Sequence, residues 1–178
     1  MTRANRLHDM LWRSALNQDI WMILDCARDP QRIFRFLVEC HLENRCLYGG
    51  NIPPALEMAA PYLVQLERDA DETHRLIDMA WGNSWGVFLS SAAALTGLRR
   101  HLREFLMVRD GMGRRMAFRY YDPRVLRCYL PTCTSSELAT VFGPIKAFWT
   151  EDEDSPDQVL EFGYPGENLR LRQLPLFP

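Results

Sequence analysis

Hydrophobic positions along this chain follow two periods, about two residues in some stretches and three to four in others. The shorter period is typical of strands and the longer one of helices. Apolar runs predict strands at residues 20–27, 45–48, 61–67 and 85–91. Within residues 61–67, apolar residues alternate with Gln65 and Glu67. We therefore expect that strand to have one wetter face.

Helical patterns lie between the predicted strands. Leu7, Met10 and Leu11 indicate a short N-terminal helix. Asp29 as an N-cap and Pro30 as the first helical residue open a second helix. The apolar stripe of this second helix is expected at Ile33, Phe34, Leu37 and Val38.

A third helix is predicted to begin at Asp71, which serves as its cap. Gly82 stands where a helix commonly ends in a left-handed residue. The inward-facing residues are expected to be Leu76, Ile77, Ala80 and Trp81.

Residues 92–108 form the clearest helical pattern, in which one face is apolar and the other carries Arg99, Arg100 and Arg103. The predicted apolar face consists of Leu95, Leu98, Leu102, Phe105 and Leu106. Further along, Thr134 and Glu137 have the spacing of a capping box. The short helix that follows is expected to stop at Gly143 and Pro144.

Alternating strands and helices without repeats or a flexible linker predict one domain spanning residues 1–178. The expected fold class is α/β in the broad sense, a mixed α+β domain with a mixed β-sheet flanked by helices. "DGMG" reads as a hairpin turn leading into residues 114–126, where side chains are expected to alternate as on a strand. Residues 155–178 are expected to form a C-terminal hairpin tail.

The composition is that of an ordinary globular protein, with 47% hydrophobic and 25% charged residues. No apolar run approaches the roughly 20 residues that cross a bilayer, and the N-terminus lacks the apolar core of a signal peptide. We therefore expect a cytoplasmic protein. The five cysteines form no C-x-x-C pair, so we expect reduced thiols and neither a metal nor another cofactor.

The net charge of −2 conceals an uneven distribution. Residues 99–127 contain nine arginines and three acidic residues, a local charge of +6, and the remainder of the chain therefore sums to −8. Lys146 is the only lysine. Arginine suits ion pairs and protein interfaces better than lysine does.

"GNSWG", residues 82–86, fits the G-x-S-x-G pattern that presents the catalytic serine of α/β-hydrolases. That arrangement requires a strand before the serine and a helix after it. Here the predicted order is reversed, and no acidic residue lies between Ser84 and His101. We interpret Ser84 as a turn residue, with a hydrolase that uses Ser84 as an alternative.

Residues 114–129 mix arginines with aromatic residues, as single-strand nucleic-acid sites do. The isoelectric point near 6.1 and the acidic stretch "TEDEDSPDQVLE" argue against a polyanionic partner. An ion-pair network in which Asp122 binds Arg119 or Arg124 is the preferred interpretation, and a nucleic-acid-binding module remains an alternative.

Several segments together are similar to one known family. In order they are "ILDCARDP", "RCLYGG", "APYLVQL", "WGNSWGVFL", "LRRHLREFLMVRD", "FRYYDPRVLRCYLPTC" and "ELATVFGPIKAFWTEDED". From about Trp21 to Asp154 the chain resembles the adaptor, or chaperone, domain of bacterial type VI secretion systems. Many relatives continue into a second, largely helical lobe, which we do not expect here because the sequence stops after "LRLRQLPLFP".

The resemblance implies a non-catalytic, cytoplasmic adaptor that binds a cognate toxin effector and helps load it onto the spike protein. It implies no catalytic residues, no nucleic acid and no membrane insertion. Positions expected to determine the fold are Trp81, Gly82, Trp85, Gly86 and Pro123. Positions expected to contact a partner are Arg99, Arg100, Arg103, Arg119, Tyr121, Asp122 and Arg124. A strand edge near the C-terminal hairpins is a second candidate surface, through β-augmentation.

Overall fold

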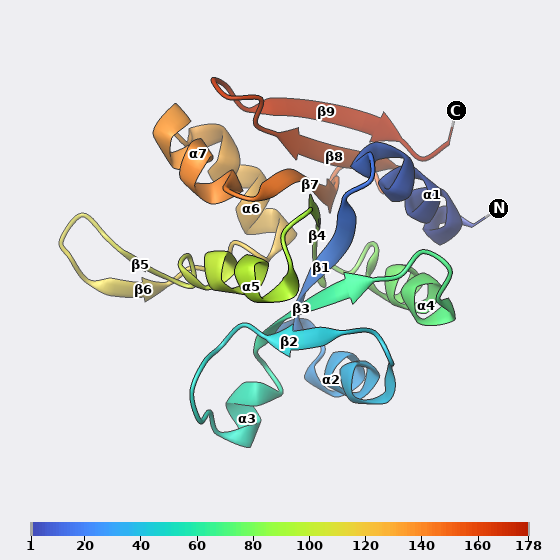
Figure 1. Cartoon of the computed structure of the whole chain (residues 1–178), viewed down its shortest axis with the longest axis horizontal. Coiled ribbons are helices and arrows are strands. Elements are labelled where there is room, and N and C mark those ends of the chain that lie inside the picture. Colours follow the sequence, from blue (N-terminus) through green and yellow to red (C-terminus); the bar gives the residue numbers. More distant parts are fainter. Residues whose placement is uncertain (1, 178) are drawn as a thin grey trace.

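The computed structural model describes residues 2–177 and places a central sheet between two layers of helices (Figure 1). Within these residues the sheet has seven strands in the order β2-β3-β1-β4-β7-β8-β9. Their bounds are β1 (Asp19–Asp25), β2 (Asn44–Cys46), β3 (Pro61–Leu66), β4 (Gly86–Ser91), β7 (Ile145–Glu151), β8 (Gln158–Gly163) and β9 (Arg170–Pro175). The α+β class is confirmed. Every neighbouring pair in the sheet is antiparallel, so the expectation of a mixed sheet is wrong in that detail.

A second, two-stranded sheet projects from the body as a hairpin (Figure 1). It is formed by β5 (Met107–Arg109) and β6 (Arg115–Ala117), joined by the predicted "DGMG" turn. We call residues 107–117 the arm. The strand predicted for residues 114–126 ends at Ala117. Beyond that residue the prediction is wrong, because the chain turns and enters the helix that begins at Pro123.

The helices lie on both faces of the central sheet (Figure 1). Their bounds are α1 (Arg3–Ala15), α2 (Pro30–Glu39), α3 (Pro54–Glu57), α4 (Asp71–Ala80), α5 (Leu95–Arg103), α6 (Pro123–Tyr129) and α7 (Ser135–Phe142), with 3-10 turns η1 (Cys26–Arg28) and η2 (Leu130–Thr132). Helices α1, α2 and α4 cover one face, and α5, α6 and α7 cover the other.

Two hydrophobic cores follow from this arrangement, one on each face of the sheet. On β1, Met22 and Leu24 belong to the first core, whereas Trp21 and Ile23 belong to the second. A strand buried on both faces needs apolar residues at successive positions, which explains the uninterrupted run in β1. The same arrangement corrects the wetter face expected for β3, since Leu63 is fully buried in the second core.

Several predicted helix boundaries are confirmed. The side chain of Asp29 accepts a hydrogen bond from the backbone N–H of Arg32, and Pro30 is the first residue of α2. Thr134 and Glu137 form the capping box of α7. Each caps a helix end whose first N–H groups have no partner within the helix.

Other helix predictions are corrected. Asp71 is the first residue of α4, and its side chain makes no capping bond. The apolar face of α2 is Ile33, Phe36 and Leu37, at the i, i+3, i+4 spacing of one helical face, while Val38 is 70% exposed. Helix α5 ends at Arg103 and is shorter than the predicted 92–108, because the chain turns to enter β5.

The C-terminal hairpins β7–β8–β9 are formed as predicted. Trp149, Glu161 and Arg172 lie opposite one another in the strand register. The buried Glu161 carboxylate accepts hydrogen bonds from Trp149 Nε1 at 3.0 Å and from Arg172 Nε at 2.8 Å. These bonds satisfy a charge that would otherwise be costly to bury.

Candidate functional site

The WGNSWG turn, residues 81–86, connects α4 to β4 at one end of the sheet. Gly82 and Ser84 both have left-handed backbone conformations, with φ of 82° and 52°. The carboxylate of Glu151, the last residue of β7, accepts hydrogen bonds from the N–H of Gly82 (2.5 Å) and from the N–H and hydroxyl of Ser84 (2.9 and 2.8 Å). Turns of this kind direct backbone N–H groups at anions. Here the anion is a side chain of the same protein.

The geometry around Ser84 differs from that of a hydrolase. Its hydroxyl donates to a carboxylate, and the turn amides of an oxyanion hole are already bound to the same Glu151. The histidines have other partners: His8 binds the carbonyl of Arg68, His41 binds Glu72, and His101 binds the carbonyl of Val141, while His74 stacks on His8. As expected from the sequence, β4 follows Ser84 and α4 precedes it.

The segment 119–124 supplies a second set of charged contacts at this end. Asp122 caps α6 by accepting from the N–H of Arg124, whose guanidinium also binds the carboxylate through Nε (3.0 Å) and Nη2 (2.6 Å). Burial raises the pKa of Asp122, but the hydrogen bonds and charge of Arg124 outweigh burial and leave the pKa below its usual value. The predicted ion pair between Asp122 and Arg124 is confirmed.

Arg119 pairs instead with Asp25, the last residue of β1. Asp25 is fully buried and also accepts a hydrogen bond from the N–H of Ala27 at 3.2 Å. Burial raises the pKa of Asp25, and the hydrogen bond and charge of Arg119 offset only part of that effect. The pair ties the chain before α6 to the end of β1.

Arg127 of α6 joins the two segments. Its Nη1 donates to the backbone carbonyl of Glu151 at 2.8 Å, and its Nη2 donates to Glu153 at 2.7 Å. A cleft of about 190 Å³ lies between the WGNSWG turn and α6. It is lined by Trp81, Gly82, Ser84, Arg124, Arg127, Glu151, Asp152, Glu153 and Pro156. We call this cleft and the contacts with Glu151 and Asp122 the signature end.

The other positions expected to determine the fold are Trp81, Trp85, Gly86 and Pro123. Trp85 is buried beneath the guanidinium of Arg32, 5.4 Å from its ring centre. A Cβ on Gly86 would lie 1.9 Å from the carbonyl oxygen of Ile23 in the neighbouring strand, so only glycine fits. Pro123 is the buried first residue of α6. Trp81 is only partly buried and donates from Nε1 to the carbonyl of Pro156 at 3.2 Å.

The three arginines predicted on one helix face have different surroundings. Arg99 donates from Nε and Nη2 to the backbone carbonyls of Cys46 (2.8 Å) and Tyr48 (3.0 Å), and thereby fastens α5 to the loop after β2. Arg100 is exposed. Arg103 is also exposed, and its guanidinium packs on Gly49, where a Cβ would lie 2.0 Å from Nη2.

The aromatic residues of segment 114–129 belong largely to the core. Tyr120 and Tyr121 are both buried, and the Tyr120 hydroxyl donates to the carbonyl of Leu102 at 2.7 Å. The expectation that Tyr120 and Tyr121 face opposite sides of a strand is wrong, because residues 118–122 are irregular. Buried rings offer no face on which a base can stack. Tyr121, which is expected to contact a partner, is thus placed among the buried residues.

Sequence reasoning missed the residues that connect the signature end. In the sequence, Glu151 lies in the acidic stretch "TEDEDSPDQVLE", Arg127 is one of the nine arginines of residues 99–127, and Asp25 lies within the predicted strand 20–27; none of these patterns assigns them a contact. An acidic residue directly after the apolar run of β1 was the available signal for Asp25, since a buried charge requires a partner.

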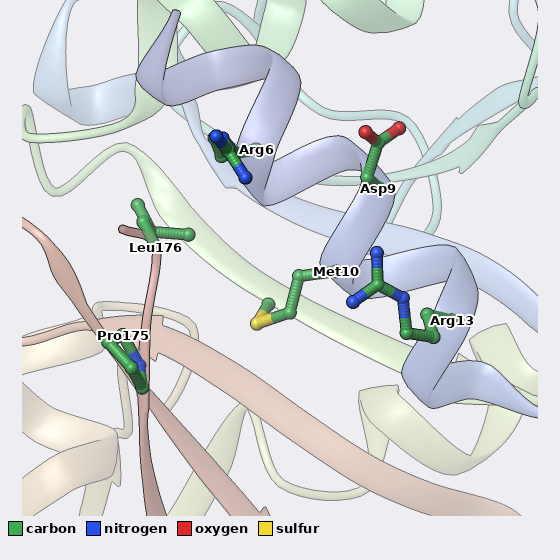
Figure 2. A pocket seen from close by; sticks show the side chains of 6 residues that line it. All are labelled: Arg6, Asp9, Met10, Arg13, Pro175 and Leu176. Carbon is green, nitrogen blue, oxygen red and sulfur yellow. The ribbon is translucent and has the colours of Figure 1, made fainter. Parts of the chain in front are cut away.

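Figure 2 shows a second hollow, of about 310 Å³, between α1 and the end of β9. Met10 extends from α1 toward Pro175 and Leu176, and Arg6, Asp9 and Arg13 complete the lining (Figure 2). The charges have both signs and form no catalytic constellation.

Among residues 2–177, no group of three or more His, Cys, Asp or Glu side chains is placed to hold a metal ion. No helix in this part of the chain is both long and apolar enough to cross a membrane.

The fold and these contacts define a three-layer α+β domain whose most distinctive residues bind its own backbone and side chains. Residues 20–140 match the family described as "Domain of unknown function (DUF4123)", and the chain belongs to this family. Comparisons with curated proteins and with solved structures gave no match.

Proposed function

We propose that this protein is a non-catalytic adaptor of a bacterial type VI secretion system. It binds a cognate toxin effector in the cytoplasm and helps load it onto the spike protein. The observation that carries the proposal is the family match over residues 20–140, together with the ordered motifs that resemble secretion adaptors.

The contacts of the signature end support a non-catalytic role. Three donors of the WGNSWG turn are bound to Glu151, and Arg124 is bound to Asp122. The cleft of about 190 Å³ is smaller than the roughly 300–1,000 Å³ typical of small-molecule sites. An adaptor instead requires exposed surface, which α5, the arm and the sheet edges provide.

The sheet edge near the C-terminus is β9, which pairs only with β8 among the described strands. Most of its residues are exposed. This is the edge at which a partner strand would be added under the proposed role.

The proposal predicts a toxin gene beside this gene, and co-expression with the product of that gene tests it. The tagged chain should retain that toxin through gel filtration at micromolar concentration. The Ser84→Ala variant should retain it equally, because the serine hydroxyl has no chemical role in an adaptor. Failure of the wild-type chain to retain the toxin would overturn the proposed function.

A further inference from the structure

The arm and the loop before α3 border an apolar groove of about 490 Å³. Its floor includes the buried side chains of Leu47, Leu106 and Tyr121. Leu56 and Met107, each 45% exposed, contribute to its walls. We call it the arm groove. Exposed apolar side chains around a buried apolar floor are typical of a binding surface.

The register of the arm shows which of its side chains share the groove face. Met107 lies opposite Ala117, and Arg109 lies opposite Arg115. Because side chains of a strand alternate between faces, these four residues lie on one face of the arm. Met107, Ala117 and Arg115 all line the groove. The arm therefore presents apolar and positively charged groups on the same side.

Two arginines of the groove have no internal partner. Arg103 and Arg115 make no side-chain hydrogen bond or ion pair with any residue in 2–177, and the groove lining contains no acidic residue. By contrast, Arg99 is fastened to backbone carbonyls and Arg114 to Asp110. The charge at the groove is thus positive and uncompensated, which favours an acidic partner.

We propose that the arm groove receives an apolar segment of the effector that is flanked by Asp or Glu residues. This inference rests on the proposed function. The apolar side chains enter between Leu56 and Met107, and the flanking carboxylates bind Arg103 and Arg115. Methionine suits such a surface because its flexible side chain adapts to different shapes. A nucleic acid fits less well, since the two tyrosines of the lining are buried (Tyr121) or partly buried (Tyr48) and leave little ring surface for stacking.

The test compares the affinity of purified variants for the toxin encoded beside this gene. Arg103→Glu combined with Arg115→Glu should weaken binding at least tenfold, because two attractive charges become repulsive. Leu56→Ser combined with Met107→Ser should also weaken it at least tenfold. Both pairs are exposed or half-exposed, so circular dichroism and the thermal midpoint should show folded proteins.

The matched control is Arg28→Glu combined with Arg35→Glu, two exposed arginines outside the groove. It makes the same change in net charge and should leave the affinity within twofold. An equal loss in this control would contradict the groove proposal, as would wild-type affinity in both groove variants. In either case retention of the toxin by the wild-type chain leaves the proposed function standing, whereas no retention by the wild-type chain overturns the proposed function itself.

A photo-crosslinking residue in place of Met107 identifies what occupies the groove. Mass spectrometry of the crosslinked complex should find an apolar toxin segment with acidic residues on either side. A crosslink to a basic segment, or to RNA added as a single-stranded oligonucleotide in preference to the toxin, would overturn the inference.

Discussion

The signature end and the arm groove both contain arginines, but they use them differently. At the signature end, Arg124 binds Asp122 and Arg127 binds Glu151 and Glu153. In the arm groove, Arg103 and Arg115 have no such partner among the described residues. The charged side chains of the signature end therefore use their hydrogen-bonding capacity inside the protein, whereas Arg103 and Arg115 do not within residues 2–177.

This difference distinguishes side chains that stabilise the fold from side chains that are available to bind a partner. Contacts such as those of Gly86 and Glu151 depend on the backbone of this fold, and any change in them disturbs the protein itself. Arg103 and Arg115 of the groove make no such contacts with the described part of the chain, so changing them should affect the binding of a partner more than the fold. Variants of the signature end should lower stability while the folded fraction still binds, and groove variants should do the reverse.

The largest effect is expected for Gly86→Ala. The new Cβ would lie 1.9 Å from the carbonyl oxygen of Ile23, and the backbone of β1 has to move. We expect a loss of about 3 kcal/mol in the free energy of unfolding, measured by urea denaturation. Gly97→Ala is the control, since a Cβ there meets no atom within 4 Å; it should stabilise α5 by about 0.5 kcal/mol. Equal stability of the two variants would contradict the close approach of β1 and β4.

Glu151→Ala should have the second largest effect. We expect a loss of about 2 kcal/mol in the free energy of unfolding, because three donors of the WGNSWG turn lose their shared charged acceptor. Glu153→Ala removes an exposed carboxylate that binds only Arg127 and should cost less than about 0.5 kcal/mol. Both are measured by thermal and urea unfolding. A Glu151→Ala protein that keeps full stability but no longer retains the toxin would contradict the assignment of the signature end to fold stability. The carboxylate would then belong to the interface with the toxin.

Asp122→Asn isolates the charge of the carboxylate, because asparagine is an equally good N-cap. We expect the variant to lose about 1 kcal/mol of the free energy of unfolding at pH 7, because its hydrogen bonds with Arg124 are no longer charge-assisted on both sides. The folded-state pKa of Asp122 is lowered, so its charge contributes stability above the usual aspartate pKa of about 3.9. That contribution disappears as the pH falls through the lowered value, and the difference between wild type and variant should shrink from about pH 4 downward. A difference that is constant between pH 7 and pH 3 would contradict the ion pair with Arg124.

Ser84→Ala should have the smallest effect, below about 1 kcal/mol, because Glu151 keeps two backbone donors when the hydroxyl is lost. Retention of the toxin should be unchanged. Loss of a hydrolytic activity in this variant, with its stability intact, would instead favour the alternative enzyme.

The order of strands and helices was predictable because each element carries its own local pattern. The apolar run of β1, the cap at Asp29 and the capping box at Thr134 depend on neighbouring residues and are confirmed. Predictions that required knowing what covers a surface were less accurate. The second face of β3 is buried because helices from a later part of the chain pack on that side of the sheet.

The candidate site was predictable only in part, for the same reason. The motif at residues 81–86 marks a turn, and the position of Gly82 after a helix identifies one of its two left-handed residues, the other being Ser84. That the turn binds Glu151 depends on the pairing of β4 with β7, which no local spacing reveals. Asp122 was the acidic candidate for Arg119 in the sequence, yet the partner of Arg119 is Asp25 from the first strand.

The pairing of β4 with β7 also sets an order of events during synthesis. Strands β1, β2, β3 and β4 leave the ribosome first, and β7 follows only after α5, the arm, α6 and α7. Until then, the edge of β4 and the amides of Gly82 and Ser84 lack the acceptors that β7 supplies. An open edge of this kind is a site of aggregation. The edge of β4 is consequently open from the time when β4 leaves the ribosome until β7, which ends with Glu151, has followed and paired with it.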